Sequence, residues 1–152
     1  MAGSIAYRAA EPADFDAIAD VWRESALASE GARSSLPSLA ELRSRVDHEI
    51  AAGWAVTVAL DGQEIIGFLA LKPALAALDQ LFILPTHQGR GIGRDLIERA
   101  KQAMPGGFTL RTASANQKAR QFYSASGLAL LEEGFHPRTG IPVCYYGWSI
   151  QG

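Results

Sequence analysis

The chain has 152 residues, of which 48% are hydrophobic and 20% charged, and its formal net charge at pH 7 is −2. This length fits one domain, which we expect to span residues 1–152, and the composition excludes disordered and fibrous proteins. The near-neutral charge argues against a nucleic-acid partner, and no apolar run reaches the length of a membrane-spanning helix. Because the N-terminus also lacks the form of a signal peptide, we predict a cytoplasmic protein without a membrane partner.

The first half of the chain predicts a strand, two helices and three further strands. A strand over residues 5–9 precedes a helix that Glu11-Pro12 opens and that ends before Gly31, and Ser38 caps a second helix. Residues 54–60 and 64–71 are rich in β-formers and flank Asp61-Gly62, which predicts an antiparallel hairpin. The next strand covers residues 78–84, because Pro85 stops it.

The second half alternates helices and strands. We expect helices over 91–104 and 114–126, and strands over 108–112, 128–131 and 143–150. Hairpins combined with strand-helix-strand crossovers predict an α/β fold with a mixed sheet. Cys144 has no partner for an internal disulfide and is expected to be a small buried residue.

Three glycines, Gly89, Gly91 and Gly93, lie between the strand over 78–84 and the following helix. Without a Cβ atom they let several backbone N–H groups turn toward one ligand, although glycines also form tight turns with no ligand. The positive end of the helix dipole, together with Arg90 and Arg94, favours an anion. We therefore predict a site for a phosphate or pyrophosphate.

The spacing of the glycines narrows the choice of ligand. No Gly-x-x-x-x-Gly-Lys-Ser/Thr run is present, which excludes a P-loop. A dinucleotide-binding Gly-x-Gly-x-x-Gly motif is excluded as well, because its last position is Arg94 when counted from Gly89 and Leu96 when counted from Gly91.

Two segments resemble the coenzyme-binding motifs of the GNAT superfamily of N-acetyltransferases. The first is Gln88-x-x-Gly91-x-Gly93 after a strand that ends Phe82-Ile83-Leu84-Pro85; the second spaces Asn116, Ala119, Phe122-Tyr123 and Gly127. The closing Tyr145-Tyr146-Gly147-Trp148 is also similar to many members. The resemblance covers nearly the whole chain. It implies a mostly antiparallel twisted sheet of about seven strands with a splayed parallel pair, flanked by about four helices.

The resemblance also implies an activity. A GNAT enzyme moves the acetyl group of acetyl-CoA to a primary amine of a small molecule or peptide by direct transfer, without a metal. The coenzyme-binding residues carried over are Phe82, Ile83, Leu84, Gln88, Gly89, Arg90, Gly91, Ile92, Gly93, Arg94, Asn116, Ala119, Phe122 and Tyr123. Asn116 could equally cap its helix. A non-catalytic acyl-CoA-binding module is the alternative, and a homodimer is a further expectation because relatives are often dimers.

The resemblance assigns Tyr123 as the acid that protonates the leaving sulfur, and it leaves the base open. Asp79 and Gln80 lie on the right strand, where alternation lets one of them face the cleft. The other candidates are Glu64, the histidines His87 and His136 in predicted solvated loops, and a chain of waters. An acyl-enzyme on Cys144 is a minor alternative. The loops over 29–36 and 132–141 are expected to face the acceptor, and their mixed charges name no particular amine.

Overall fold

A seven-stranded sheet in the order β1-β2-β3-β4-β5-β7-β6 runs through the protein, in a computed structural model that describes residues 5–28 and 37–149. The strands are β1 (Ile5–Ala9), β2 (Ala55–Asp61), β3 (Glu64–Lys72), β4 (Ala77–Ile83), β5 (Phe108–Ala113), β6 (Ala129–Phe135) and β7 (Pro142–Trp148). All neighbouring strands are antiparallel except β4 and β5, which are parallel. The predicted mixed, mostly antiparallel sheet is confirmed.

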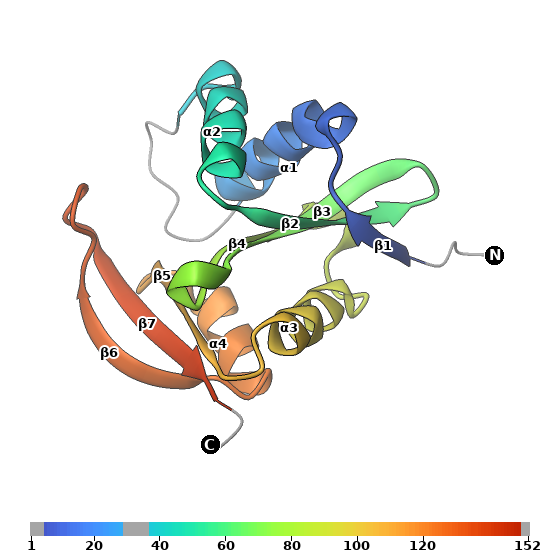
Figure 1. The fold of residues 1–152 in the computed structure, drawn as a ribbon. Coiled ribbons are helices and arrows are strands. Elements are labelled where there is room, and N and C mark those ends of the chain that lie inside the picture. Colours follow the sequence, from blue (N-terminus) through green and yellow to red (C-terminus); the bar gives the residue numbers. More distant parts are fainter. Residues whose placement is uncertain (1–4, 29–36, 150–152) are drawn as a thin grey trace.

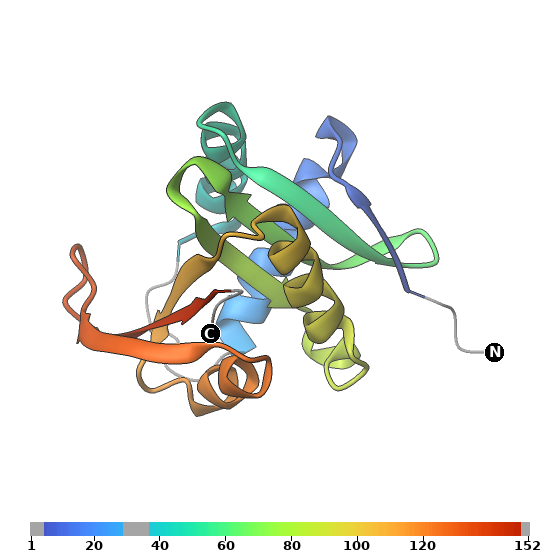
Figure 2. The same ribbon diagram turned by 60° about the horizontal axis from the view of Figure 1, so that its bottom comes forward.

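Two helices cover each face of the sheet. Figure 1 shows α1 (Phe15–Ala28) and α2 (Leu39–Ala51) on one face, and α3 (Ile92–Ala103) and α4 (Gln117–Ala125) on the other. The view in Figure 2 shows α3 crossing the sheet on the side away from α1. Within residues 5–28 and 37–149 there are three short 3-10 helices, which the sequence pattern did not predict. Each begins at a proline: η1 (Pro12–Asp14), η2 (Pro73–Leu75) and η3 (Pro85–His87). The fixed φ of proline suits such a first helical position.

Polar side chains fix the start of η1, which leads directly into α1, and the start of α2. The Glu11 amide donates to Asp14 Oδ2 at 2.8 Å, and Arg8 Nη1 lies 2.6 Å from the same oxygen. At α2, Ser38 Oγ accepts from the Glu41 amide at 3.1 Å, and Glu41 Oε1 accepts from the Ser38 amide at 3.3 Å. This reciprocal capping confirms the predicted role of Ser38.

Each face of the sheet carries its own apolar core. Under α1 and α2, the rings of Trp22, Trp54 and Phe68 lie 5.5 to 6.4 Å apart between centroids. Under α3 and α4, buried side chains come from the helices and from β3, β5 and β7, including Leu96, Ile97, Leu69, Leu110 and Tyr146. Burying both faces explains why β3 is apolar over almost its whole length.

The C-terminal boundaries differ most from the sequence prediction. The helix predicted over 114–126 is shorter, because the Asn116 side chain accepts from the Ala119 amide at 3.1 Å and the helix begins after this cap. The strand predicted over 128–131 is longer: a bulge at Leu131 interrupts its pairing with β7, and the ladder then continues to Phe135. The strand β7 ends at Trp148, and Ile150 lies outside the described residues.

No helix in the described part of the chain is long and apolar enough to cross a membrane. Within residues 5–28 and 37–149, no three His, Cys, Asp or Glu side chains are grouped to hold a metal ion. The cytoplasmic location stays a prediction.

Candidate functional site

The parallel strands β4 and β5 separate soon after they meet. They pair only at Ala77 and Thr109 within the described ranges, where the Thr109 amide donates to the Ala76 carbonyl at 3.0 Å. Beyond this point β4 continues along β3 as far as Ile83, and β5 continues along β7. The C-terminal half of β4 therefore has one edge that β5 does not pair, and we call the space along this edge the strand opening.

The main chain of Leu81 and Ile83 faces the strand opening. The Leu84 amide donates to the Ile66 carbonyl on β3 at 2.8 Å. Because successive peptide groups of a strand point to opposite edges, those of Phe82 also face β3, and those of Leu81 and Ile83 face the other way. Of the three strand residues predicted from sequence, Ile83 alone has its main chain on this edge, and Leu81, which the motif did not indicate, has its main chain there too.

The glycine turn leads from the end of β4 into α3. Gly89 and Gly91 have φ of +83° and +81°, a conformation that favours glycine, and Gly91 is the N-cap of α3. The first helical hydrogen bond runs from the Asp95 amide to the Gly91 carbonyl at 3.1 Å. The helix therefore does not use the amides of the three residues between them, 92–94, which lie at the positive end of its dipole.

Gly93 lets α3 approach α4 closely. A Cβ atom at this position would lie 2.9 Å from Phe122 Cζ and 3.3 Å from Ile83 Cδ1. Phe122 and Ala119 pack against the core on this side of the sheet, and Ile92 is 1% exposed. Ile92 can thus reach a ligand through its backbone only.

A chain of hydrogen bonds connects the end of β4 with α4. Gln88 Nε2 donates to the Ile83 carbonyl at 3.1 Å, and Lys118 Nζ, from the first turn of α4, donates to Gln88 Oε1 at 2.5 Å. The Arg94 guanidinium lies over the turn, since its Nη2 would be 3.5 Å from a Cβ atom at Gly91. Cationic and main-chain donors therefore surround the turn, which suits a phosphate ligand.

Tyr123 lies on α4 among aromatic rings. It is 8% exposed, and its ring centroid is 5.4 Å from that of Phe122 and 6.0 Å from that of Tyr146. Burial raises the pKa of the Tyr123 phenol to about 12, because the charged phenolate is disfavoured away from water. The phenol is thus protonated at neutral pH and is able to donate a proton.

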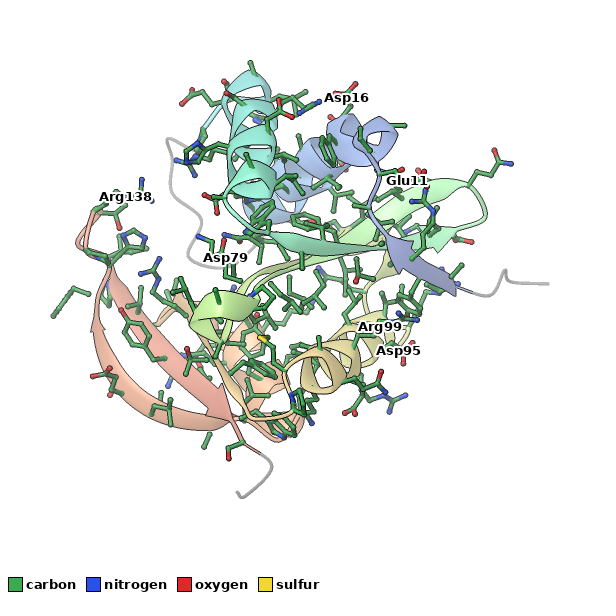
Figure 3. All side chains as sticks on the ribbon, in the orientation of Figure 1. Glu11, Asp16, Asp79, Asp95, Arg99 and Arg138 are labelled. Carbon is green, nitrogen blue, oxygen red and sulfur yellow. The ribbon has the colours of Figure 1, made fainter. Side chains whose placement is uncertain are left out.

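A polar cluster lies at the other end of β4, close to where β4 and β5 pair. Trp54 Nε1 donates to Asp79 Oδ2 at 2.8 Å, and Lys72 Nζ lies 3.8 Å from the same oxygen and 2.9 Å from Glu49 Oε2. The contact with Glu49 is the main cause of the raised Lys72 pKa, which burial and, to a smaller extent, the cation Arg138 oppose. Figure 3 shows Asp79 on β4 and Arg138 on the hairpin between β6 and β7, on the same side of the molecule.

A bulge in β4 changes the alternation expected for Asp79 and Gln80, which would have placed their side chains on opposite faces of the sheet. Ala70 pairs with Gln80 and Leu71 with Leu78, so Asp79 is the extra residue of the bulge. Gln80 is opposite Ala70 of the α1–α2 core, and Asp79 is bonded to Trp54 of that same core. Both residues therefore lie on the α1–α2 side of the sheet.

The remaining candidates lie elsewhere. Glu64 begins β3 at the end opposite Lys72, about 26 Å away at ~3.3 Å per residue. His87 contacts Asp61, and its side chain is 15% exposed. The prediction that this histidine is solvated is therefore wrong. His136 Nδ1 accepts from the Arg138 and Thr139 amides at 3.1 and 3.3 Å, which shapes the β6–β7 turn.

Cys144 is fully buried, as predicted, with Sγ 3.3 Å from Ser114 Oγ. Residues 29–36, which we expected to face the acceptor, lie outside the described residues.

The chain is similar to two named N-acetyltransferases, to one of them over nearly its full length. A Mycobacterium tuberculosis N-acetyltransferase is 29% identical over 167 aligned positions, which cover 97% of this chain and 94% of that protein. An Escherichia coli peptidyl-lysine N-acetyltransferase is 28% identical over 90 residues, which cover 59% of this chain and 60% of that protein.

Solved structures share the fold. A GNAT acetyltransferase of Desulfovibrio desulfuricans has a TM-score of 0.78 at 18% identity, over 96% of this chain and 99% of that one. A phosphinothricin acetyltransferase of Sinorhizobium meliloti, solved in complex with acetyl-CoA, has a TM-score of 0.75 at 20% identity, over 98% and 89% of the two chains. The model of the acetyltransferase (GNAT) family matches residues 16–128, which include the strand opening, the glycine turn and Tyr123. The chain therefore belongs to the acetyltransferase (GNAT) family.

Proposed function

We propose that this protein transfers the acetyl group of acetyl-CoA directly to a primary amine of a small molecule or peptide, and that residues 1–152 act as one domain. The observation that carries the proposal is the strand opening, which lies beside a glycine turn at a helix N-terminus. Named N-acetyltransferases among its relatives and a neighbour solved with acetyl-CoA support this proposal.

The coenzyme would lie along the strand opening with its diphosphate at the glycine turn. Amides of residues 89–94 would bind the diphosphate oxygens, with Arg94 and Arg90 nearby, and the main chain of Leu81 and Ile83 would pair with the extended pantetheine arm. Gln88 now occupies the Ile83 carbonyl, so its side chain would turn away when the coenzyme pairs there. Asn116, which caps α4, would act on the coenzyme only through the position of that helix.

When bound, acetyl-CoA supplies the acetyl thioester that the amine attacks. Main-chain donors of β4 that face the strand opening would stabilise negative charge on the acetyl oxygen, an effect worth about 2.7–4 kcal/mol per donor elsewhere. The protonated phenol of Tyr123 would donate to the departing sulfur.

Asp79 is our candidate for the base that deprotonates the incoming ammonium, with Gln80 beside it on the same side of β4. The Trp54 indole holds one carboxylate oxygen of Asp79, and Asp79 is partly exposed. A carboxylate in this position would also attract a cationic acceptor.

The proposed acceptor is a primary amine, a class that includes the peptidyl-lysine side chain named for the Escherichia coli relative. A screen that detects released coenzyme thiol, with acetyl-CoA and a set of amino acids, polyamines, aminoglycosides and lysine peptides, tests the proposal. We expect at least one amine to release thiol in proportion to its acetylated product. A screen that stays blank although acetyl-CoA binds tightly would favour a non-catalytic acyl-CoA-binding module instead.

A further inference from the structure

A carboxylate on the β2–β3 hairpin contacts a residue just before the glycine turn and a residue within it. Asp61, the last residue of β2, has its Oδ2 atom 3.0 Å from His87 Nε2 and 3.4 Å from Arg90 Nη1. His87 ends the 3-10 helix that precedes the turn, and Arg90 lies between Gly89 and Gly91. The side chains of Asp61 and His87 are 30% and 15% exposed, so this contact is partly shielded from water.

Both ring nitrogens of His87 are engaged. When the neutral ring donates from Nε2 to Asp61, its Nδ1 accepts from the Thr86 hydroxyl, whose Oγ1 lies 2.9 Å away. The protonated ring keeps both contacts, because Nδ1–H then donates to Thr86 Oγ1. The link between the hairpin and the turn is thus retained in either protonation state of His87.

The contact fixes a segment that would otherwise be variable. Gly89 and Gly91 both adopt positive φ, and glycine loses more conformational freedom on ordering than any other residue. A turn already held in its binding conformation binds a ligand more tightly, because less freedom is lost on binding.

The charge of Asp61 has the opposite effect on an anionic ligand. A carboxylate beside a phosphate site repels the ligand, although solvent and the neighbouring cations reduce this repulsion. Removing the charge therefore tightens binding if repulsion dominates, and weakens binding if the position of the turn dominates.

We propose that Asp61 is a positioning residue that, through His87 and Arg90, holds the glycine turn in the conformation that binds the coenzyme diphosphate. This inference rests on the proposed function. It predicts that removing the Asp61 side chain weakens acetyl-CoA binding, because losing the position of the glycine turn has a larger effect than removing the repulsion between the carboxylate and the diphosphate.

The test compares acetyl-CoA binding by calorimetry in the wild-type protein and in Asp61→Ala, His87→Ala and the double variant; alanine is used because the amide oxygen of asparagine would still accept from His87. We expect each single variant to bind about tenfold more weakly, and the double variant to bind no more weakly than either, since both substitutions break one link. With an active amine, KM for acetyl-CoA should rise more than kcat falls. Glu64→Gln is the matched control: it removes the same charge from the same hairpin, and acetyl-CoA affinity should stay within about twofold of wild type.

The outcomes separate this inference from the proposed function. Absence of acetyl-CoA binding in the wild-type protein contradicts the proposed function itself. Wild-type binding together with equal or tighter binding by Asp61→Ala overturns the positioning role, and so does an equal loss in Glu64→Gln. Circular dichroism confirms that each variant is folded, and His87→Ala, which leaves the carboxylate in place, provides a second measurement if Asp61→Ala is unstable.

Discussion

Tyr123 is a buried phenol, 8% exposed, on α4. Its replacement by phenylalanine keeps the ring packed against Phe122 and Tyr146 and removes only the hydroxyl. We expect Tyr123→Phe to lower kcat by about 10²-fold or more, as loss of a positioned acid does, with acetyl-CoA affinity nearly unchanged. Steady-state kinetics and calorimetry measure the two effects, and an equal loss in both would remove Tyr123 from the acid role. Since the pKa is about 12, ionisation of this phenol should not limit the rate below pH 10.

Asp79 gives a prediction that depends on pH. If its carboxylate takes the proton of the amine, Asp79→Asn should lower kcat at least tenfold at pH 7. The loss should shrink as pH rises, because the free amine then deprotonates without help. The control is Asp47→Asn on the exposed face of α2, where the carboxylate is 62% exposed and pairs with Arg43. A loss that is the same at all pH values, or that Asp47→Asn shares, would contradict the role of base.

Asp14 links acid stability to the start of α1. The Arg8 guanidinium lowers the pKa of the Asp14 carboxyl, so the folded state binds this proton less readily than the unfolded chain. The stabilisation is therefore present above the ordinary pKa near 3.8 and is lost as pH falls through the lower, folded value. Urea unfolding at pH 7 should show Asp14→Asn less stable than wild type by a few tenths of a denaturant molar unit, with a smaller difference at pH 3.

Asp16→Asn is the matched control for Asp14, because Asp16 lies two residues further on, in the first turn of α1, but is 87% exposed. It should leave the unfolding midpoint close to that of wild type at both pH values. An Asp14→Asn effect that persists undiminished at low pH would assign the stabilisation to packing rather than to charge.

The helices α3 and α4 cross closely because Gly93 has no side chain. A Cβ atom there would overlap the end of the Phe122 ring, and overpacking of this kind costs about 1–3 kcal/mol. Gly93→Ala should therefore lower Tm and weaken acetyl-CoA binding, although alanine is the better helix former. Gly106→Ala, at a glycine with no atom within 4 Å of its added Cβ, should change neither quantity. Equal behaviour of the two variants in thermal melts would show that the close crossing is unimportant.

Elements follow from local patterns in the sequence to different degrees. Ser38 and Asp61-Gly62 were predictable because a cap and a hairpin turn depend on neighbouring residues. The bulge at Asp79 was not, since the extra residue appears only when β4 is paired with β3. The contact between Asp61 and His87 was also hidden, because it joins residues 26 positions apart whose types are common on surfaces.

At the scale of the whole molecule, the order of elements predicted an α/β fold with a mixed sheet, and the family resemblance implied one parallel pair within a mostly antiparallel sheet, as the structure has it. The separation of β4 from β5 followed only from the family resemblance, since nothing in either strand forbids longer pairing. Which peptide groups of β4 face the strand opening is known only from the hydrogen bond that the Leu84 amide donates to the Ile66 carbonyl. The sequence motif therefore did not indicate Leu81. The acceptor, the homodimer and the cytoplasmic location stay predictions.

The central claim is that main-chain amides of the glycine turn hold the diphosphate of acetyl-CoA while its extended arm lies between β4 and β5. A crystal structure of the protein with acetyl-CoA tests it most directly. We expect diphosphate oxygens at hydrogen-bond distance from the amides of residues 89–94, and pantetheine paired with Leu81 and Ile83. Coenzyme bound elsewhere, or an unchanged Gln88 bridge with no coenzyme in the strand opening, would contradict the account.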